Sequence, residues 1–138
     1  MQLPITLGTA SALGVLFVGL SVLVTAARVR GGTGLGLGVE APDGTPSPLL
    51  VASRRQGHFA EYVPYSLILL GLLEAWGLQR TLLLTFAGLL IVARLILSFG
   101  INARTPNPWR LAGNALQWGL ILAMSGTGAW RIYESQLR

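Results

Sequence analysis

The chain contains no cysteine and no lysine, and charged residues make up only 11% of its 138 residues. Without cysteine, disulfide bridges, thiolate catalysis, cysteine-ligated zinc and iron–sulfur clusters are all excluded. Without lysine, the chain has no phosphate-binding loop of the Walker type. A single histidine leaves too few nitrogen ligands for a histidine-based metal centre, so we expect no metal site.

Apolar residues are abundant: 52% of the chain is hydrophobic, and the mean hydropathy is +0.62. Such a composition indicates an integral membrane protein in contact with lipids. The net charge of +5 arises from ten arginines and five acidic residues. Because the arginines lie mostly between apolar segments, they set membrane topology and do not form the basic face that nucleic-acid binding requires. We therefore expect no nucleic-acid partner.

Four segments are long and apolar enough to cross the hydrocarbon core of a bilayer, which takes about 20 helical residues. They cover about residues 4–27, 53–76, 81–101 and 109–133. The loop 28–52 is rich in glycine and proline and is expected to be irregular. The chain is thus predicted to be an all-α membrane protein with a single domain over residues 1–138. Its fold class is a four-transmembrane-helix bundle with both termini on the same side.

The charges predict how this bundle lies in the membrane. The side of the termini carries three arginines, Arg80, Arg131 and Arg138, whereas six flank the first and third loops: Arg28, Arg30, Arg54, Arg55, Arg104 and Arg110. By the positive-inside rule, loops 28–52 and 102–108 face the cytoplasm. In the first segment the arginines follow the apolar stretch and do not precede it, which favours a retained helix over a cleaved signal peptide.

Ionisable residues open the second span. On a helix, Arg54, His58, Glu61 and Tyr65 share one stripe, because they are spaced by four, three and four residues. Charged groups within a membrane usually face a partner, a ligand or water. The stripe is therefore a candidate ligand site, although a membrane histidine is more often packed or interfacial than catalytic.

A second intramembrane charge, Arg94, lies in the third span at about the depth of Glu61. Because these two spans form a hairpin, we expect Glu61 and Arg94 to meet. The pair would either fix helix packing or give a positive charge to a cavity, and the structural interpretation is favoured. Glu74 lies on nearly the opposite face, close to the membrane boundary, and is expected to be solvated or to cap a helix.

The fourth span begins with another polar stripe, formed by Arg110, Asn114 and Gln117. These side chains either make hydrogen bonds between helices or form a second wall of the same cavity. In the simpler case, Arg110 extends from the helix start to the lipid phosphates. The structural interpretation and the cavity-wall interpretation of this stripe both stay open.

These features resemble the MAPEG family, the membrane-associated proteins in eicosanoid and glutathione metabolism. The family's pattern Arg-x-x-x-(Asn/His)-x-x-Glu-x-x-Pro opens the second span, here at Arg54, His58, Glu61 and Pro64. The segment from Arg94 to Gly100 is similar to the family's third span, and Arg110-Leu-Ala-Gly113 is similar to the start of its fourth. The chain looks most similar to small bacterial members.

The resemblance implies a homotrimer in a bacterial inner membrane, with glutathione bound as co-substrate between subunits near the cytoplasmic side. Position by position, it implies that glutathione contacts Arg54, His58, Glu61, Tyr62 and Arg94, with Arg28 or Arg30 and Gln56 from the adjacent subunit. Arg110 matches the family's thiolate-stabilising arginine, which makes it the candidate catalytic residue. The thiolate would attack a hydrophobic small-molecule electrophile that arrives through the membrane lipids.

The chain departs from the family late in the third span, where Leu97 and Ile101 stand in place of tyrosines of the eicosanoid-metabolising members. Three functions stay open. The first is a glutathione-dependent transferase or peroxidase that acts on lipophilic electrophiles. The second is a non-catalytic membrane bundle that binds a lipid or an anionic ligand. A small transporter is disfavoured, because the chain lacks broken-helix repeats.

Overall fold

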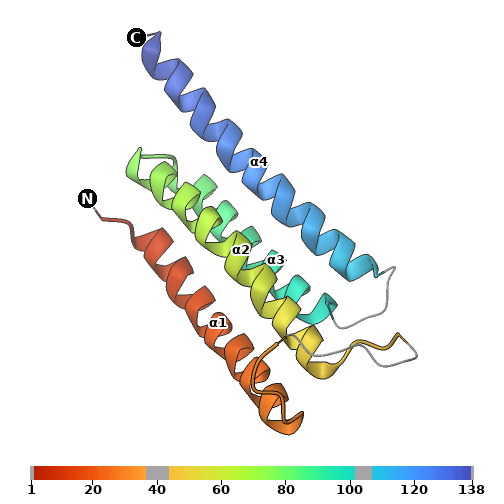
Figure 1. Ribbon diagram of the computed structural model, residues 1–138. Helices are drawn as coiled ribbons and strands as arrows, with labels where there is room; N and C mark the ends of the chain where they lie inside the picture. Colours follow the sequence, from red (N-terminus) through yellow and green to blue (C-terminus); the bar gives the residue numbers. More distant parts are fainter. Residues whose placement is uncertain (1, 37–43, 102–106, 138) are drawn as a thin grey trace.

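The computed structural model describes residues 2–36, 44–101 and 107–137. These residues form α1 (Pro4–Arg30), α2 (Pro48–Ala75), α3 (Arg80–Gly100) and α4 (Pro108–Gln136). Successive helices run in opposite directions, so both termini lie at one end of the bundle (Figure 1). We call this the terminal end, and the end with the α1–α2 and α3–α4 connections the connection end. The predicted fold class, an all-α four-helix bundle with both termini on one side, is confirmed.

Proline and a capping side chain determine where two of the helices begin. Ser47 Oγ accepts a hydrogen bond from the backbone N–H of Leu50 at 3.1 Å, and Pro48 follows as the first residue of α2. Proline suits this position because the first turn of a helix has no acceptor for its N–H. Asn107 caps α4 before Pro108 in the same way. As a result, α2 begins before the predicted membrane segment 53–76.

The core lies where α1, α2, α3 and α4 face one another. Each helix contributes one large apolar side chain that is at most 1% exposed, namely Leu13, Leu70, Leu90 and Met124. Helix α1 packs against α2, and α4 packs against α3, so α1 and α4 lie at opposite edges of the described bundle (Figure 1). Large apolar side chains also cover much of the outer surface. An apolar exterior of this extent is what a bilayer covers.

The four helices differ in how apolar they are. By length and composition, α1 and α3 are each apolar enough to cross a membrane. Helices α2 and α4 are longer than α3 but carry the polar stripes predicted for the second and fourth spans. Each helix nevertheless contributes one buried polar residue to the interior, namely Thr9, Ser66, Arg94 and Gln117.

Glycines bring α3 and α4 close together at the connection end. A Cβ atom on Gly113 would lie 2.7 Å from Leu97 Cγ, which is closer than real Cβ contacts come. A Cβ on Gly100 would lie 3.1 Å from the backbone nitrogen of Arg110. Asn107 also donates a side-chain hydrogen bond to the carbonyl oxygen of Gly100. The start of α4 is thus held firmly against the end of α3.

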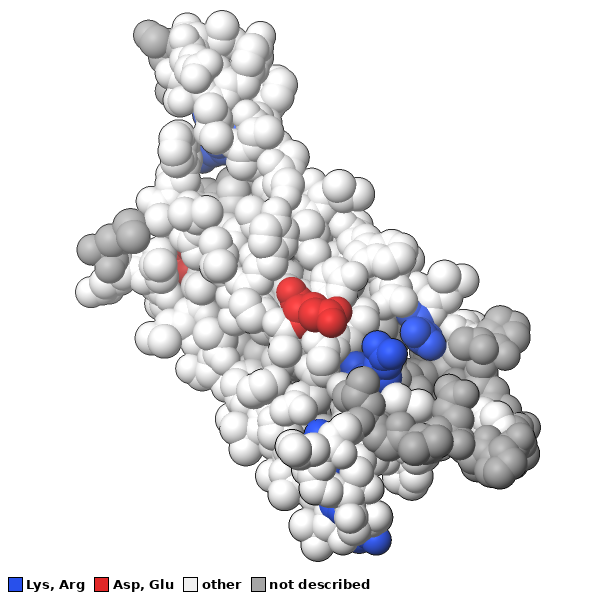
Figure 2. All heavy atoms as spheres, in the orientation of Figure 1, with Lys and Arg blue, Asp and Glu red and all other residues white. Residues whose placement is uncertain are grey.

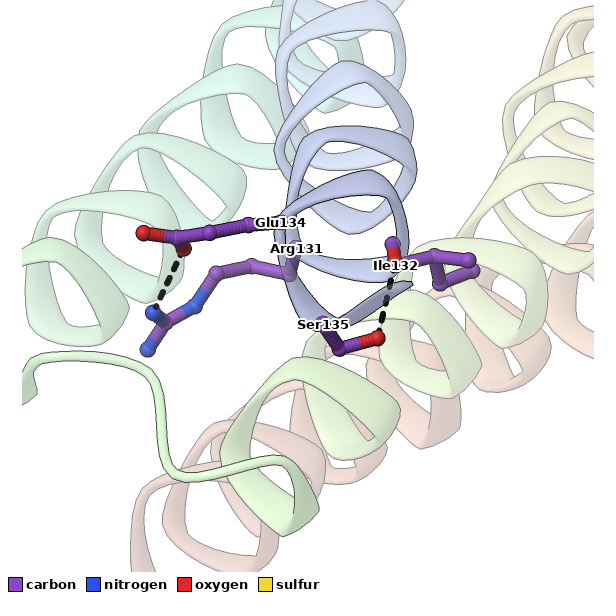
Figure 3. A network of polar contacts seen from close by, with 4 residues as sticks. All are labelled: Arg131, Ile132, Glu134 and Ser135. Atoms are coloured by element: carbon purple, nitrogen blue, oxygen red, sulfur yellow. Dashed lines mark hydrogen bonds and ion pairs between the residues drawn. The ribbon is translucent and has the colours of Figure 1, made fainter. Parts of the chain in front are cut away.

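At the terminal end, polar groups pair within and between helices. Both carboxylate oxygens of Glu74 accept backbone hydrogen bonds from the first turn of α1, from Ile5 N–H at 2.9 Å and Thr6 N–H at 2.8 Å. Of the two roles expected for Glu74, it performs the capping one. In the last turns of α4, Arg131 pairs with Glu134 at 3.4 Å, and Ser135 donates to the Ile132 carbonyl (Figure 3).

Candidate functional site

Arg94 lies at the centre of a polar cluster between three helices. The residue is in α3 and only 1% exposed. Its Nε donates a hydrogen bond to Gln117 Oε1 on α4 at 3.1 Å. Its Nη1 donates to the backbone carbonyl of His58 on α2 at 3.3 Å and lies 3.3 Å from Nδ1 of the same residue. The guanidinium therefore connects α3 to both α2 and α4.

The cluster continues from Gln117 into α2. Gln117 Nε2 donates to Ser66 Oγ at 2.9 Å, and Ser66 donates in turn to the Tyr62 carbonyl at 2.8 Å. The ring of Tyr62 stacks on that of His58, with centroids 4.6 Å apart. Arg94 Cζ lies 5.7 Å from the Tyr62 ring centroid, within the range of a cation–π contact. Arg94 thus lies against the face of α2 that carries residues 58, 62 and 66.

The predicted ion pair between Glu61 and Arg94 is wrong. Glu61 is exposed on α2, and within the described residues the salt bridge that forms is the distant one between Arg131 and Glu134. With His58 and Tyr62 turned inward, the rotation of about 100° per residue carries Glu61 away from α3. Gln117 of α4 takes the place against Arg94 that we expected the acid to occupy.

The cluster leaves two buried polar atoms without partners in the described part of the chain. Arg94 Nη2 is a buried donor without an acceptor, and Asn114 Oδ1, one turn before Gln117 on α4, is a buried acceptor without a donor. A buried cation is costly unless an opposite charge or hydrogen bonds compensate it. Six side chains in the described chain hold such an atom, and Arg94 is the one among them that is buried as a whole. A ligand can complete its hydrogen bonding.

The other predicted site residues surround this cluster on the connection-end half of the bundle. Arg54, Glu61 and Arg110 are exposed on α2 and α4, and Arg30 is exposed at the end of α1. In Figure 2, the blue spheres, which are arginines because the chain lacks lysine, gather mostly toward this end. The connection end is therefore the positive end of the bundle on the face shown.

Two predicted residues make contacts within the chain. Arg28 is half-buried, and its Nη1 donates to the Gly34 carbonyl at 3.2 Å. Gln56 Nε2 donates to Ser21 Oγ on α1 at 2.8 Å. The structure thus brings His58, Tyr62 and Arg94 into direct contact, whereas Arg28 and Gln56 are engaged elsewhere.

Sequence reasoning missed Ser66, which is fully buried and completes the path from Gln117 to Tyr62. The available signal was its spacing of four residues from Tyr62 and eight from His58, which places all three on one helix face. Tyr65, which the initial stripe included, is exposed. Within the described residues, no group of three or more histidine or acidic side chains could hold a metal ion.

Four helices with an apolar exterior, and an interior arginine that has no acidic partner among the described residues, define the class of the molecule. It is an integral membrane bundle with a polar interior site. The sequence model of the MAPEG family matches residues 6–130. The chain therefore belongs to the MAPEG family, whose members are glutathione-dependent transferases or peroxidases, or eicosanoid-related proteins, and are often trimeric. No curated protein and no solved structure matches the chain.

Proposed function

We propose that this protein is a glutathione-dependent transferase or peroxidase that acts on lipophilic electrophiles as a membrane-embedded homotrimer. One observation carries the proposal: Arg94 is buried, has no acidic partner and retains an unpaired Nη2 among the described residues. An anionic ligand would compensate this charge. Members of the family commonly use glutathione, which is such an anion.

The residues present fit glutathione chemically. Its carboxylates are acceptors for Arg94 Nη2 and for the exposed guanidinium of Arg54, and its amide groups offer the donor that Asn114 Oδ1 lacks. Glu61 is an exposed acid on the same helix as Arg54 and suits the ammonium group of the peptide. The His58 and Tyr62 rings supply a flat surface beside the arginine.

When bound, glutathione supplies the thiol that attacks the electrophile as a thiolate. We assign Arg110 to hold the sulfur in this form, because a nearby cation favours S⁻ over SH. Arg110 is in the first turn of α4, where the positive end of the helix dipole acts in the same direction. Gln117 would serve as a positioning residue, since its hydrogen bond orients Arg94.

A neighbouring subunit would complete the site in the trimer. Arg54 and Glu61 are exposed on a helix whose outer face is otherwise apolar, and charges in that environment favour a protein partner over lipid. The adjacent chain would contribute Arg28 or Arg30 and Gln56. In the single chain the Gln56 amide nitrogen is bonded to Ser21, so its carbonyl oxygen is the atom left for a ligand. The site would face the cytoplasm of a bacterial inner membrane, with loops 28–52 and 102–108 on that side.

Calorimetric titration of glutathione into the purified protein tests this proposal, together with an assay of conjugation to a generic aryl halide. We expect binding and conjugation by the wild type, and loss of both in Arg54→Ala and Glu61→Ala. Both residues are exposed, so these variants should fold. Arg131→Ala, at the opposite end, is the matched control and should bind normally. Failure of the wild type to bind or conjugate would overturn the enzyme proposal, and binding of an anionic lipid instead would support the non-catalytic alternative.

A further inference from the structure

A second concave site begins at the terminal end, on the side of α3 that faces α1. It is a groove of about 740 Å³ between the start of α1 and the first half of α3. Its lining is mostly apolar and includes Ile5, Gly8, Leu83, Leu84, Gly88 and Ile91. The volume is within the range of about 300–1,000 Å³ that ligand-binding pockets have. Neither the proposed chemistry nor its residues involve this groove.

Two glycines keep the groove open. A Cβ atom added at Gly8 on α1, or at Gly88 on α3, would meet nothing within 4 Å. Elsewhere in the bundle, at Gly100 and Gly113, glycine instead permits close helix contact. At these two positions the groove therefore opens outward, above a floor that includes the buried side chains of Leu83 and Ala87.

A positive charge at one end of the groove indicates that its occupant carries an anionic group. Arg80, the first residue of α3, lines the groove and is exposed, with no ion pair or hydrogen bond of its side chain among the described residues. Glu74 also lines the groove, but its two oxygens accept the N–H groups of Ile5 and Thr6. The cation that is left available favours an anionic group such as a phosphate.

The length of the groove distinguishes a lipid chain from a helix of a partner as its occupant. From Arg80 to Ile91, α3 advances by about 16 Å along its axis. Half of the hydrocarbon core, which is the depth of one leaflet, is about 15 Å. A transmembrane helix of a second copy would need a groove along the whole span. Trp76, exposed just before Arg80, is the kind of aromatic residue that marks the membrane interface, so Arg80 lies at headgroup level.

We propose that this groove is a phospholipid-binding site, with Arg80 bound to the lipid phosphate and one acyl chain lying between α1 and α3. The lipid comes from the leaflet on the side of the two termini. It fills the space that Gly8 and Gly88 leave and joins the start of α1 to α3. The site is separate from the glutathione site and does not depend on it.

Photo-crosslinking tests the proposal directly. The full-length protein is reconstituted in phosphatidylglycerol vesicles that contain a small fraction of the same lipid with a diazirine in mid-acyl chain, and adducts are mapped by mass spectrometry. We expect adducts concentrated on residues 5–9 and 83–91. Gly88→Leu, or Gly8→Leu on the other wall, fills the groove and should lower these adducts to the level of the remaining lipid-exposed surface. Gly119→Leu, whose site on α4 is also open, is the matched control and should leave them unchanged.

The headgroup contact is tested by Arg80→Gln, which removes one charge-assisted hydrogen bond and should weaken retention of the lipid about tenfold. Arg131→Gln, near the same end but paired with Glu134, should not weaken it. Equal adduct yields in the wild type and both filled variants would overturn the proposal. So would a disulfide-linked dimer of Gly88→Cys in this cysteine-free chain, since a second copy would then occupy the groove. Labelling of the groove by a photoreactive aryl halide, with none by the phospholipid, would assign it to substrate and likewise overturn the proposal.

Discussion

Glu74 at the terminal end and Arg94 in the connection-end half differ in whether hydrogen bonds within the fold satisfy them. At the terminal end, both oxygens of Glu74 are satisfied by backbone N–H groups of α1, and the contact joins two parts of the fold. In the connection-end half, Arg94 makes hydrogen bonds to α2 and α4 and still retains an unpaired nitrogen. Unsatisfied side-chain atoms also occur on Thr6, Ser53, Arg55, Asn114 and Arg131, but among these six residues Arg94 is the one that is buried as a whole. An open cation in the interior indicates a ligand. We therefore separate a structural carboxylate, Glu74, from a ligand-binding cation, Arg94.

The largest expected effect comes from removing the open charge itself. Arg94→Met should weaken glutathione binding by about 3 kcal/mol, roughly 100-fold, because a buried charge contact is lost. The free energy of unfolding should also fall, by about 1–3 kcal/mol, because the buried Gln117 Oε1 is left without its donor. Calorimetry and thermal unfolding in detergent measure the two quantities. If Arg94→Met is less stable but its folded fraction binds glutathione normally, Arg94 has a structural role and does not bind the ligand.

Close helix packing beside the site should matter for stability more than for chemistry. In Gly113→Ala, the new Cβ would meet Leu97 at 2.7 Å, and overpacking of this kind costs about 1–3 kcal/mol. The measurement is the midpoint of thermal unfolding. Gly119→Ala introduces the same atom where nothing lies within 4 Å and should not destabilise. Equal midpoints for the two variants would mean that α3 and α4 are not held together as described.

At the terminal end, Glu74→Ala should destabilise the protein by about 1 kcal/mol, the usual effect of losing a helix cap. Amide exchange of Ile5 and Thr6 should accelerate, because their N–H groups lose their acceptors. Glutathione affinity should stay unchanged. A marked loss of affinity in this variant would contradict the separation of Glu74 from the glutathione site.

The smallest effect belongs to the ion pair between Arg131 and Glu134, which are spaced three residues apart on α4 and partly exposed. Pairs of this kind contribute about 0.3–0.5 kcal/mol. Arg131→Gln should therefore shift the unfolding midpoint barely at all, and the shift should vanish in high salt. A loss comparable to that of Glu74→Ala would require a larger structural role for the end of α4.

Hydropathy and proline placement were sufficient to predict four helices, their order and the common side of the termini. The inward face of α2 was predicted only in part, because periodicity places residues on a common face but does not set how a helix is rotated against its neighbours. Contact between Gly113 and Leu97 brings α4 close enough for Gln117 to reach Arg94, so the glutamine and not Glu61 meets the guanidinium. This outcome depends on packing of distant segments, which a single sequence does not display.

The groove at the terminal end was not predicted at all. It exists because two glycines, Gly8 and Gly88, face an open space from helices that are separated in sequence. Absence of side chains leaves no signal in hydropathy. The arginine beside it, Arg80, was interpreted only as a topology marker, since its place at the mouth of a groove emerges from the arrangement of α1 against α3.

The most direct test of the central claim is a structure of the protein in lipid nanodiscs with glutathione bound, determined by electron cryomicroscopy. Our account predicts a carboxylate oxygen of glutathione within about 2.7–3.2 Å of Arg94 Nη2. It also predicts that Gln117 keeps its hydrogen bond to the same guanidinium. Glutathione bound at a position where Arg94 makes no contact with it, or a protein acid paired with Arg94 in the bound state, would contradict the claim.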